Sequence, residues 1–331
     1  MTRRVGASTA TLDLTEYERE LTGFCYRMLG SAFDAEDAVQ ETLLRAWRSR
    51  AQFDSTRGSR RTWVYTIARN VCLDMLRSKV RRSRPVAYGA AAPLGGPLGV
   101  PLGPEHWVTP VPEAWVVDQA ADPAVIVQQR ESIRLAFVAA LQVLPPKQRA
   151  VLILKDVLAW ESGEIASVLG TSPQAVNSSL QRARRTMAEL ELAPSDVMDP
   201  TDAGQVALIE RFTRAFESND VAGLVSLMRE DTAMTMPPFT WWLSGRHAIC
   251  VAMEASDSCR GARLVTVSAS GCPAFAQYRR DDTGVWRPWA LMLLELRGGL
   301  IQELTTFLDA DRMFTALGIP AALSTSFSAD R

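Results

Sequence analysis

The chain has 331 residues, 47% hydrophobic and 22% charged, with a formal net charge of −1, a composition typical of soluble globular proteins. Its length is too great for one compact core and indicates two or three domains. The five cysteines lack the paired spacing of zinc ligands and only two histidines are present, which argues against a metal site, a disulfide framework and a bound cofactor.

The sequence gives no sign of a membrane or secreted protein. No apolar stretch reaches the length of a membrane span, and the N-terminus lacks the apolar core of a signal peptide. We therefore expect a cytoplasmic protein. The net charge conceals a segregation of charges, because basic residues gather at Arg77, Lys79, Arg81, Arg82 and Arg84 and again at Arg182, Arg184 and Arg185.

Residues 14–84 predict a helical domain. A helix over 16–29 is followed by a second one that we expect Asp34 to cap, with Val39, Thr42, Leu43, Ala46 and Trp47 facing inward. Its other face is acidic. Acidic residues in a first helical turn often only complement the helix dipole, but a docking surface for a basic partner is the functional alternative. The residues concerned are Asp34, Glu36, Asp37, Gln40 and Glu41.

The next predicted helix interleaves aromatic and basic residues. Bases stack on aromatic rings while guanidinium groups hold phosphates, so this pattern favours contact with unpaired nucleic acid. A lone Trp63 would more often belong to a core, but the basic residues around it shift the balance. The candidate residues are Arg60, Arg61, Trp63, Tyr65, Arg69, Asn70 and Arg77.

Residues 85–122 are rich in Pro, Gly and Ala without a helical or strand period and predict a linker. Its second half carries Trp107, Val108, Trp115, Val116 and Val117, which a disordered linker would rarely hold. We therefore expect this half to pack on a domain of the same chain.

Residues 123–192 predict a second helical domain that contains a helix-turn-helix over 162–190. Helices over 130–144 and 147–157 precede a short helix capped by Ser162, a turn at Gly170 and a helix that begins at Ser172-Pro173. Val176, Leu180, Ala183, Met187 and Leu190 predict the buried stripe of that last helix. An amphipathic helix with a solvated basic side is the plain alternative, but the tandem arrangement favours DNA recognition. The exposed candidates are Gln174, Asn177, Ser178, Gln181, Arg182 and Arg185.

After a linker over 193–203, residues 204–320 predict an α+β domain. Two helices over 204–229 precede strand-like runs over 233–238, 240–245, 262–270, 274–280, 286–299 and 300–308. Asp281 to Gly284 and Arg297 to Gly299 predict hairpin turns. The predicted fold class is therefore multidomain, with two all-α units followed by an α+β unit.

The motifs DAEDAVQETLLRAW, RTWVYTIARNVCLDMLR and LPPKQRAVLILKDVLAWESGEIASVLGTSPQAVNSSLQRARRTM together resemble regions two and four of extracytoplasmic-function sigma factors of the sigma-70 family. The resemblance implies that the acidic helix docks on the β′ clamp of core RNA polymerase and that the second helical domain meets the β flap. It also implies that residues 53–77 melt the minus-ten element and capture a flipped base before Trp63, while residues 173–185 read the minus-thirty-five element.

The last domain, with MPPFTWWLSGRHAI and FLDADRMFTALGIP, resembles the SnoaL-like branch of the nuclear-transport-factor-two-like superfamily. Sigma factors with such a C-terminal domain, including the SigG-like group, are known in actinobacteria, and the resemblance implies that this domain regulates promoter binding. A related group of sigma factors has a DGGGK-type motif late in this domain. This chain has only Arg297-Gly298-Gly299 near the expected place, so we do not expect it to share that group's mode of regulation. A small-molecule pocket is a candidate, lined by Trp241, Trp242, His247, Tyr278 and Trp289.

The preferred hypothesis is a sigma factor without catalytic residues, whose partners are core RNA polymerase, promoter DNA and, as a candidate, a small ligand of the C-terminal domain. One alternative is a stand-alone helix-turn-helix regulator with a ligand-sensing domain. Another is an isomerase or cyclase fused to a DNA-binding module, for which a general base would be needed. The candidates for that base are His247, Asp231 and Asp309, each of which has a plainer role in a loop, turn or helix start.

Overall fold

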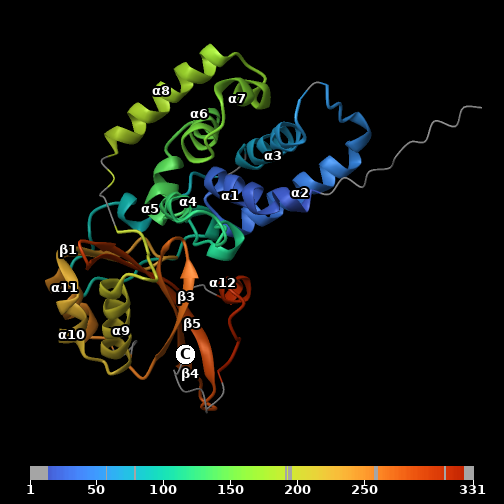
Figure 1. The fold of residues 1–331 in the computed structure, drawn as a ribbon. Coiled ribbons are helices and arrows are strands. Elements are labelled where there is room, and N and C mark those ends of the chain that lie inside the picture. The colour runs from blue at the N-terminus through green and yellow to red at the C-terminus, as the bar shows by residue number, and fades with distance from the viewer. Residues whose placement is uncertain are drawn as a thin grey trace, which may run out of the picture.

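The computed structural model describes residues 14–56, 58–77, 80–190, 192, 196–256, 260–308 and 311–323. Helices occupy the N-terminal part of the chain, and a twisted sheet with its own helices forms the C-terminal part (Figure 1). The predicted multidomain α and α+β fold class is confirmed. Across the described ranges, every helix is too short or too polar to span a bilayer.

The first helical unit consists of α1 (Glu18–Leu29), α2 (Ala32–Arg48) and α3 (Arg60–Leu76). Ser31 caps α2 by accepting a hydrogen bond from the amide of Asp34 at 3.3 Å, so the prediction that Asp34 is the cap was wrong. The prediction that Trp47 faces inward was also wrong, because this ring lies near the end of α2 and is 60% exposed. Val39, Thr42 and Ala46 are buried as expected.

The second helical unit runs from α4 to α8. Its helices are α4 (Pro123–Glu131), α5 (Leu135–Leu141), α6 (Pro146–Leu152), α7 (Ser162–Leu169) and α8 (Pro173–Glu189), with a π-helical turn at Ile153–Val157. The single helix predicted over 130–144 is interrupted, because Arg134 adopts an extended backbone with φ −62° and ψ 142° and cannot continue a helix. Its side chain extends to the C-terminal sheet.

The helix-turn-helix has the predicted geometry with one shift. Glu161, not Ser162, is the N-cap of α7, where it forms a capping box with Glu164. Gly170 ends α7 in the left-handed region at φ 61°, and Ser172 caps α8 by accepting from the amide of Ala175. The predicted buried stripe of α8 is confirmed up to Ala183, whereas Leu190 is 36% exposed because α8 ends at Glu189.

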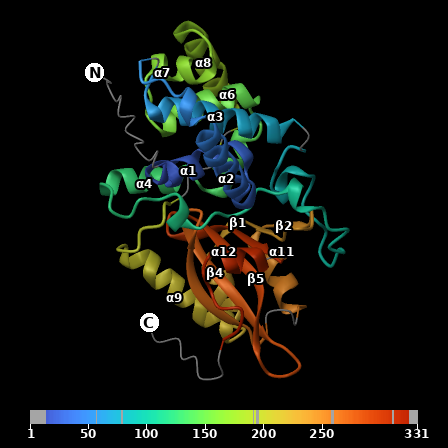
Figure 2. The same cartoon turned by 90° about the vertical axis from the view of Figure 1, so that its right-hand side faces the viewer.

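The C-terminal unit is an α+β fold. Its elements are α9 (Ala203–Glu217), α10 (Val221–Ser226), β1 (Met228–Thr235), β2 (Trp242–Ser244), α11 (Arg246–Glu254), β3 (Arg263–Ala269), β4 (Cys272–Arg280), β5 (Trp286–Arg297), β6 (Leu300–Phe307) and α12 (Asp311–Ala316). The sheet order is β2-β1-β6-β5-β4-β3, and only β1 and β6 among these pairs run parallel. Figure 2 shows α12 on the sheet face opposite α9.

The two faces of the sheet belong to different cores. On one face Phe275 stacks on Phe212 of α9, at 5.1 Å between ring centroids, within a core that α9, α10 and α11 complete. On the other face Tyr278 packs edge-on against Phe314 of α12. This second core continues without interruption into both helical units. The helical units and the sheet are therefore held together by one shared apolar core.

The second half of the predicted linker is built into this shared core, which confirms the expectation that it packs on the rest of the chain. Trp107, Val108 and Val111 are at most 2% exposed. Thr109 donates its amide to the carbonyl of Gly30 at 3.1 Å, next to α1. The amide of Ser270, between β3 and β4, donates to the carbonyl of Val111 at 2.9 Å. This segment therefore bonds the first helical unit to the sheet.

Candidate nucleic-acid interface

The predicted recognition face of α8 is open to solvent. All of its candidate residues are exposed, namely Gln174, Asn177, Ser178, Gln181, Arg182 and Arg185. Asn177 accepts a hydrogen bond from the Ser162 hydroxyl at 3.0 Å, which ties α8 to α7. Arg184 lies off this face and pairs with Asp156 at 2.6 Å. The exposed amide and guanidinium groups present donors and acceptors of the kind that base edges and phosphates require.

The second candidate set, on α3, is partly covered by the second helical unit. Tyr65 is fully buried, and its ring lies 4.7 Å from that of Trp160, which precedes α7. Burial raises the pKa of the Tyr65 phenol well above its usual value. Arg61 pairs with Glu20 and also lies over the Trp160 ring at 4.4 Å from the centroid. In this arrangement the Tyr65 ring is not accessible to DNA, and the Arg61 side chain is partly covered, with 39% of it exposed.

The remaining α3 candidates differ in accessibility. Arg69 is half-buried and donates to the carbonyl of Leu169 in α7 at 3.4 Å. Asn70 and Arg77 are exposed, and Arg60 is half-buried. The structure thus brings the α3 set together on one helix but turns part of it toward the second helical unit.

The loop before α3 forms a small pocket where the resemblance places a flipped base. Phe53 and Trp63 pack with their ring centroids 5.3 Å apart, and both line a cavity of about 320 Å³. Ser59 and Thr66 add hydroxyl groups to its wall. Ser167 of α7 completes the wall, so the second helical unit narrows this pocket.

Buried arginines fix the two helical units to each other. Arg27 of α1 donates to the carbonyl of Ser132 at 3.2 Å, and burial lowers the pKa of its guanidinium to about 10. Arg149 of α6 donates to the carbonyl of Met28 at the end of α1, and burial lowers its pKa to about 10 as well. Gln142 adds a bond to the carbonyl of Arg27 at 3.2 Å. The bonds from Arg149 and Gln142 satisfy two of the terminal carbonyls of α1, those of Met28 and Arg27.

The acidic face of α2 is only partly free. Glu36, Asp37 and Gln40 are exposed, whereas Asp34 pairs with Arg82 at 2.6 Å and Glu41 with Arg45 at 2.6 Å. Leu44 and Trp47 extend the exposed face with apolar side chains that are 50% and 60% exposed. Sequence reasoning missed this extension, although the spacing of Gln40, Leu44 and Trp47 places them on one helical stripe.

The basic run after α3 does not form the single cationic cluster that its sequence suggests. Arg82 is 6% exposed and donates to the carbonyl of Trp107 as well as pairing with Asp34. Arg84 pairs with Glu303 of β6 at 2.8 Å. Arg77 and Arg81 are exposed, and Lys79 lies outside the described residues. Part of the run therefore stabilises the fold instead of facing solvent.

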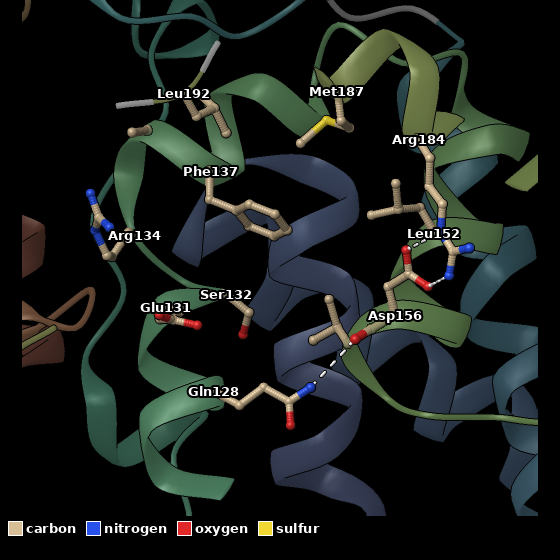
Figure 3. Close-up of a pocket in the computed structure, with 12 residues that line it drawn as sticks. Gln128, Glu131, Ser132, Arg134, Phe137, Leu152, Asp156, Arg184, Met187 and Leu192 are labelled. Atoms are coloured by element: carbon tan, nitrogen blue, oxygen red, sulfur yellow. Dashed lines mark hydrogen bonds and ion pairs between the residues drawn. The ribbon is translucent and has the colours of Figure 1, made fainter. Parts of the chain in front are cut away.

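A cleft of about 490 Å³ opens between the helices of the second helical unit (Figure 3). Phe137 of α5, Leu152 of α6 and Met187 of α8 make its walls apolar. The ion pair between Arg184 and Asp156 closes one side. Gln128, Glu131 and Arg134 add polar and charged groups, so the lining is mixed, as in grooves that receive amphipathic helices.

The C-terminal unit holds a separate cavity, but fewer of the predicted pocket residues line it than expected. Trp241 and Trp289 do so. Tyr278 lies on the opposite sheet face, where its hydroxyl donates to the carbonyl of Pro320 at 2.6 Å, because side chains alternate along β4. His247 is exposed on α11, and Trp242 donates its indole N–H to the carbonyl of Gly89 at 3.0 Å. These three predictions of cavity lining were wrong.

The candidates for a general base are not brought to this cavity. His247 and Asp231 are exposed, and Asp309 lies outside the described residues. The described residues that line the cavity include no Asp, Glu or His. Elsewhere in the described ranges, no cluster of three or more His, Cys, Asp or Glu side chains could hold a metal ion.

Comparison with known proteins assigns both helical units to regions of the sigma-70 family. Residues 14–82 match the family model of sigma-70 region 2, and residues 134–187 match that of sigma-70 region 4. The chain is 42% identical over 317 residues to the ECF RNA polymerase sigma factor SigG of Mycobacterium tuberculosis (strain ATCC 25618 / H37Rv), an alignment that covers 93% of this chain and 83% of SigG.

One solved structure shares the fold over nearly the whole chain. The crystal structure of the extracytoplasmic-function sigma factor SigJ of Mycobacterium tuberculosis covers 93% of this chain and 100% of SigJ, with a TM-score of 0.58 and 22% identity. A putative ketosteroid isomerase from Kribbella flavida matches 35% of this chain and 81% of its own, with a TM-score of 0.27 and 17% identity.

The fold and the exposed recognition helix define a DNA-binding protein with a helix-turn-helix and an added α+β domain. The chain belongs to the extracytoplasmic-function sigma factors of the sigma-70 family, and it carries an α+β unit after its two sigma regions. It is therefore an RNA polymerase sigma factor, a member of a family that binds RNA polymerase and promoter DNA.

Proposed function

We propose that this structure is a closed form of the sigma factor, in which the C-terminal domain holds the promoter-binding surfaces in an arrangement unsuited to DNA. The packing of Arg61 and Tyr65 against Trp160 carries this proposal. Both residues belong to the α3 set that the family resemblance assigns to the minus-ten element. For Tyr65 and the covered part of Arg61 to contact DNA, the two helical units must separate. The exposed face of α8 can read the minus-thirty-five element without such a movement.

We further propose where core polymerase binds. The exposed face of α2, with Glu36, Asp37 and Gln40 extended by Leu44 and Trp47, suits the β′ clamp, because it combines acidic groups with a large aromatic anchor. The cleft of the second helical unit suits a helix of the β flap. Both surfaces remain accessible in the closed form, so polymerase could bind first and opening could follow.

A pair of carboxylates in the C-terminal sheet supports the proposed regulatory role. Glu295 of β5 and Glu303 of β6 are direct cross-strand neighbours, and both side chains are at most 10% exposed. Glu303 pairs with Arg84, which follows the first helical unit, and Glu295 pairs at 2.7 Å with Arg134, which lies within the second. Buried like charges side by side would repel, so each carboxylate needs its arginine. The sheet thereby holds both helical units in one relative position.

We propose that the C-terminal domain binds and does not catalyse. The described lining of its cavity offers no Asp, Glu or His to move a proton, and the exposed His247 and Asp231 do not reach it. A small molecule in this cavity would then act as an effector. The stand-alone regulator considered from sequence fits less well, because it leaves the exposed α2 face without a partner.

The test is transcription by core polymerase reconstituted with the full chain and with the double variant Glu295→Gln and Glu303→Gln. Each substitution keeps the side-chain shape but leaves a buried arginine without its counter-charge, which weakens docking by roughly 3–5 kcal/mol per pair. We expect severalfold more promoter-specific transcript from the variant, because the helical units separate more easily.

The matched control is Glu230→Gln, which removes an exposed pair with Arg246 on the same domain. It should leave transcript levels unchanged, since exposed pairs contribute little. Transcript levels that are equal or lower for the folded double variant would contradict the regulatory role of the C-terminal domain.

A further inference from the structure

The cavity of the C-terminal domain has the size and lining of a small-molecule site. It has a volume of about 480 Å³, within the range of ligand pockets. Apolar and aromatic side chains supply most of its wall, among them Met234, Phe239, Trp241, Met253 and Met292. These side chains come from β1, from the loop before β2, from α11 and from β5, so the cavity lies between the sheet and its covering helices.

One buried amide belongs to this largely apolar wall, to which Ser256, Arg279 and Thr306 also contribute polar groups. Gln277 of β4 is 2% exposed and lines the cavity, and its Nε2 has no hydrogen-bond partner among the described residues. A buried donor without a partner is unfavourable, and a ligand atom that accepts its hydrogen bond would remove that penalty. Arg279, on the same face of β4, lies over the Trp289 ring at 3.7 Å from its centroid. Its charge is therefore held at the cavity wall beside an aromatic face.

The first half of the interdomain linker supplies another wall of the cavity. Leu98 lines it, although it is far from the sheet in sequence. The linker is fastened on both sides of Leu98, because the amide of Ala92 donates to the carbonyl of Trp242 at 2.8 Å and that of Leu102 donates to the carbonyl of Pro238 at 2.8 Å. Residues 89–102 therefore form a strap across the cavity, and Leu98 remains 38% exposed.

We propose that this cavity binds a neutral, compact, ring-containing molecule whose carbonyl oxygen accepts a hydrogen bond from Gln277 Nε2, with the strap of residues 89–102 as its lid. The apolar walls select a ring system of low polarity, and the buried amide selects an acceptor over a hydrocarbon. The ligand gives Leu98 apolar contacts that the empty cavity does not provide. Binding therefore stabilises the strap of residues 89–102 in its position over the cavity.

The strap gives the ligand a route to the promoter-binding units. It lies between Arg84, which pairs with Glu303, and the linker segment that bonds α1 to the sheet. A ligand that fastens the strap favours the docked arrangement and lowers transcription. This consequence rests on the regulatory function proposed above, whereas the existence of the site does not.

The test uses the full chain and an acylated dimethylaminonaphthalene, a neutral fluorescent ketone whose emission shifts to the blue in apolar surroundings. We expect saturable binding of one molecule per chain. Gln277→Leu should weaken binding about tenfold, the factor that corresponds to loss of one well-placed hydrogen bond. The same variant should melt at a higher temperature without the probe, because it removes a buried donor that has no partner. Leu98→Ala should also weaken binding.

Hydrogen exchange tests the lid. The probe should slow exchange of the strap amides of Ala92 and Leu102, while His247→Ala, exposed on α11, should change neither binding nor exchange. Absence of saturable binding, or equal affinity in Gln277→Leu, would overturn the site. Unchanged exchange together with full affinity in Leu98→Ala would overturn the lid. Binding as expected without an effect on transcription would support the site and count against the regulatory function alone.

Discussion

Trp47 and Trp160 have opposite environments. Trp47 is 60% exposed at the end of α2, and Trp160 is 2% exposed between the two helical units. The Trp160 ring contacts Tyr65 and lies under the Arg61 guanidinium, so it contributes to the closed arrangement. Trp47 contacts Arg50, whose guanidinium lies 4.4 Å from its ring centroid.

Substituting these tryptophans should separate stability from polymerase binding. Trp160→Ala should lower the free energy of unfolding by about 3–5 kcal/mol, because it leaves a cavity in a packed interface. Trp47→Ala should change it by less than about 0.5 kcal/mol but weaken binding to core polymerase about tenfold, as loss of an aromatic anchor does. Denaturant unfolding and a polymerase binding titration measure the two effects. If Trp47→Ala lost as much stability as Trp160→Ala, the assignment of Trp47 to an exposed polymerase-binding surface would be refuted.

At the scale of elements, the helix-turn-helix depends on the backbone of its turn. Gly170 adopts φ 61°, and a Cβ at this position would meet no atom within 4 Å. Gly163 lies inside α7 with an ordinary helical backbone, and a Cβ there would also meet no atom within 4 Å. The two glycines thus differ in backbone conformation and not in available space.

Alanine at these positions should have opposite effects on stability. Gly170→Ala should destabilise the chain by about 1 kcal/mol, because side chains with a Cβ disfavour the left-handed region. Gly163→Ala should stabilise it by up to about 1 kcal/mol through higher helix propensity. Thermal unfolding of both variants checks the pair. Destabilisation of similar size in both would show that space, not backbone conformation, governs the turn.

At the scale of the whole molecule, the turn between β3 and β4 lies directly against the second helical unit. Gly271 adopts φ 66°, and a Cβ there would lie 2.5 Å from the carbonyl oxygen of Arg130. Gly298, in the turn between β5 and β6, adopts φ 61° but would place its Cβ in open space. Both turns need a residue with a left-handed backbone. Of the two, only the turn with Gly271 also packs its backbone closely against the second helical unit.

Gly271→Ala should therefore open the molecule, and Gly298→Ala should not. The first variant combines backbone strain with a clash against main-chain atoms, at a cost of roughly 2–4 kcal/mol that separation of the units would relieve. The second should cost about 1 kcal/mol and leave the units docked. Small-angle X-ray scattering should show a larger radius of gyration for Gly271→Ala alone. Equal radii for the two variants would mean that this contact does not hold the units together.

Local sequence patterns were sufficient for most elements. The turn of the helix-turn-helix, the cap of α8, the buried stripe of α8 up to Ala183 and the run of strands follow from periodicity and from residues such as Gly170 and Ser172. The exposed face of α8 follows from the same periodicity. These features depend on neighbours within a few positions along the chain, which is why the sequence alone could predict them.

Other features depend on contacts between distant segments. No local pattern indicates that Arg84 and Arg134 pair with adjacent strands, that Tyr65 is covered by Trp160, or that Leu98 closes the C-terminal cavity. The sequence by itself determined the family and the units, because helices and strands carry their own periodicity. The tertiary structure decided which surfaces are free, because burial of a side chain depends on what the rest of the chain brings against it.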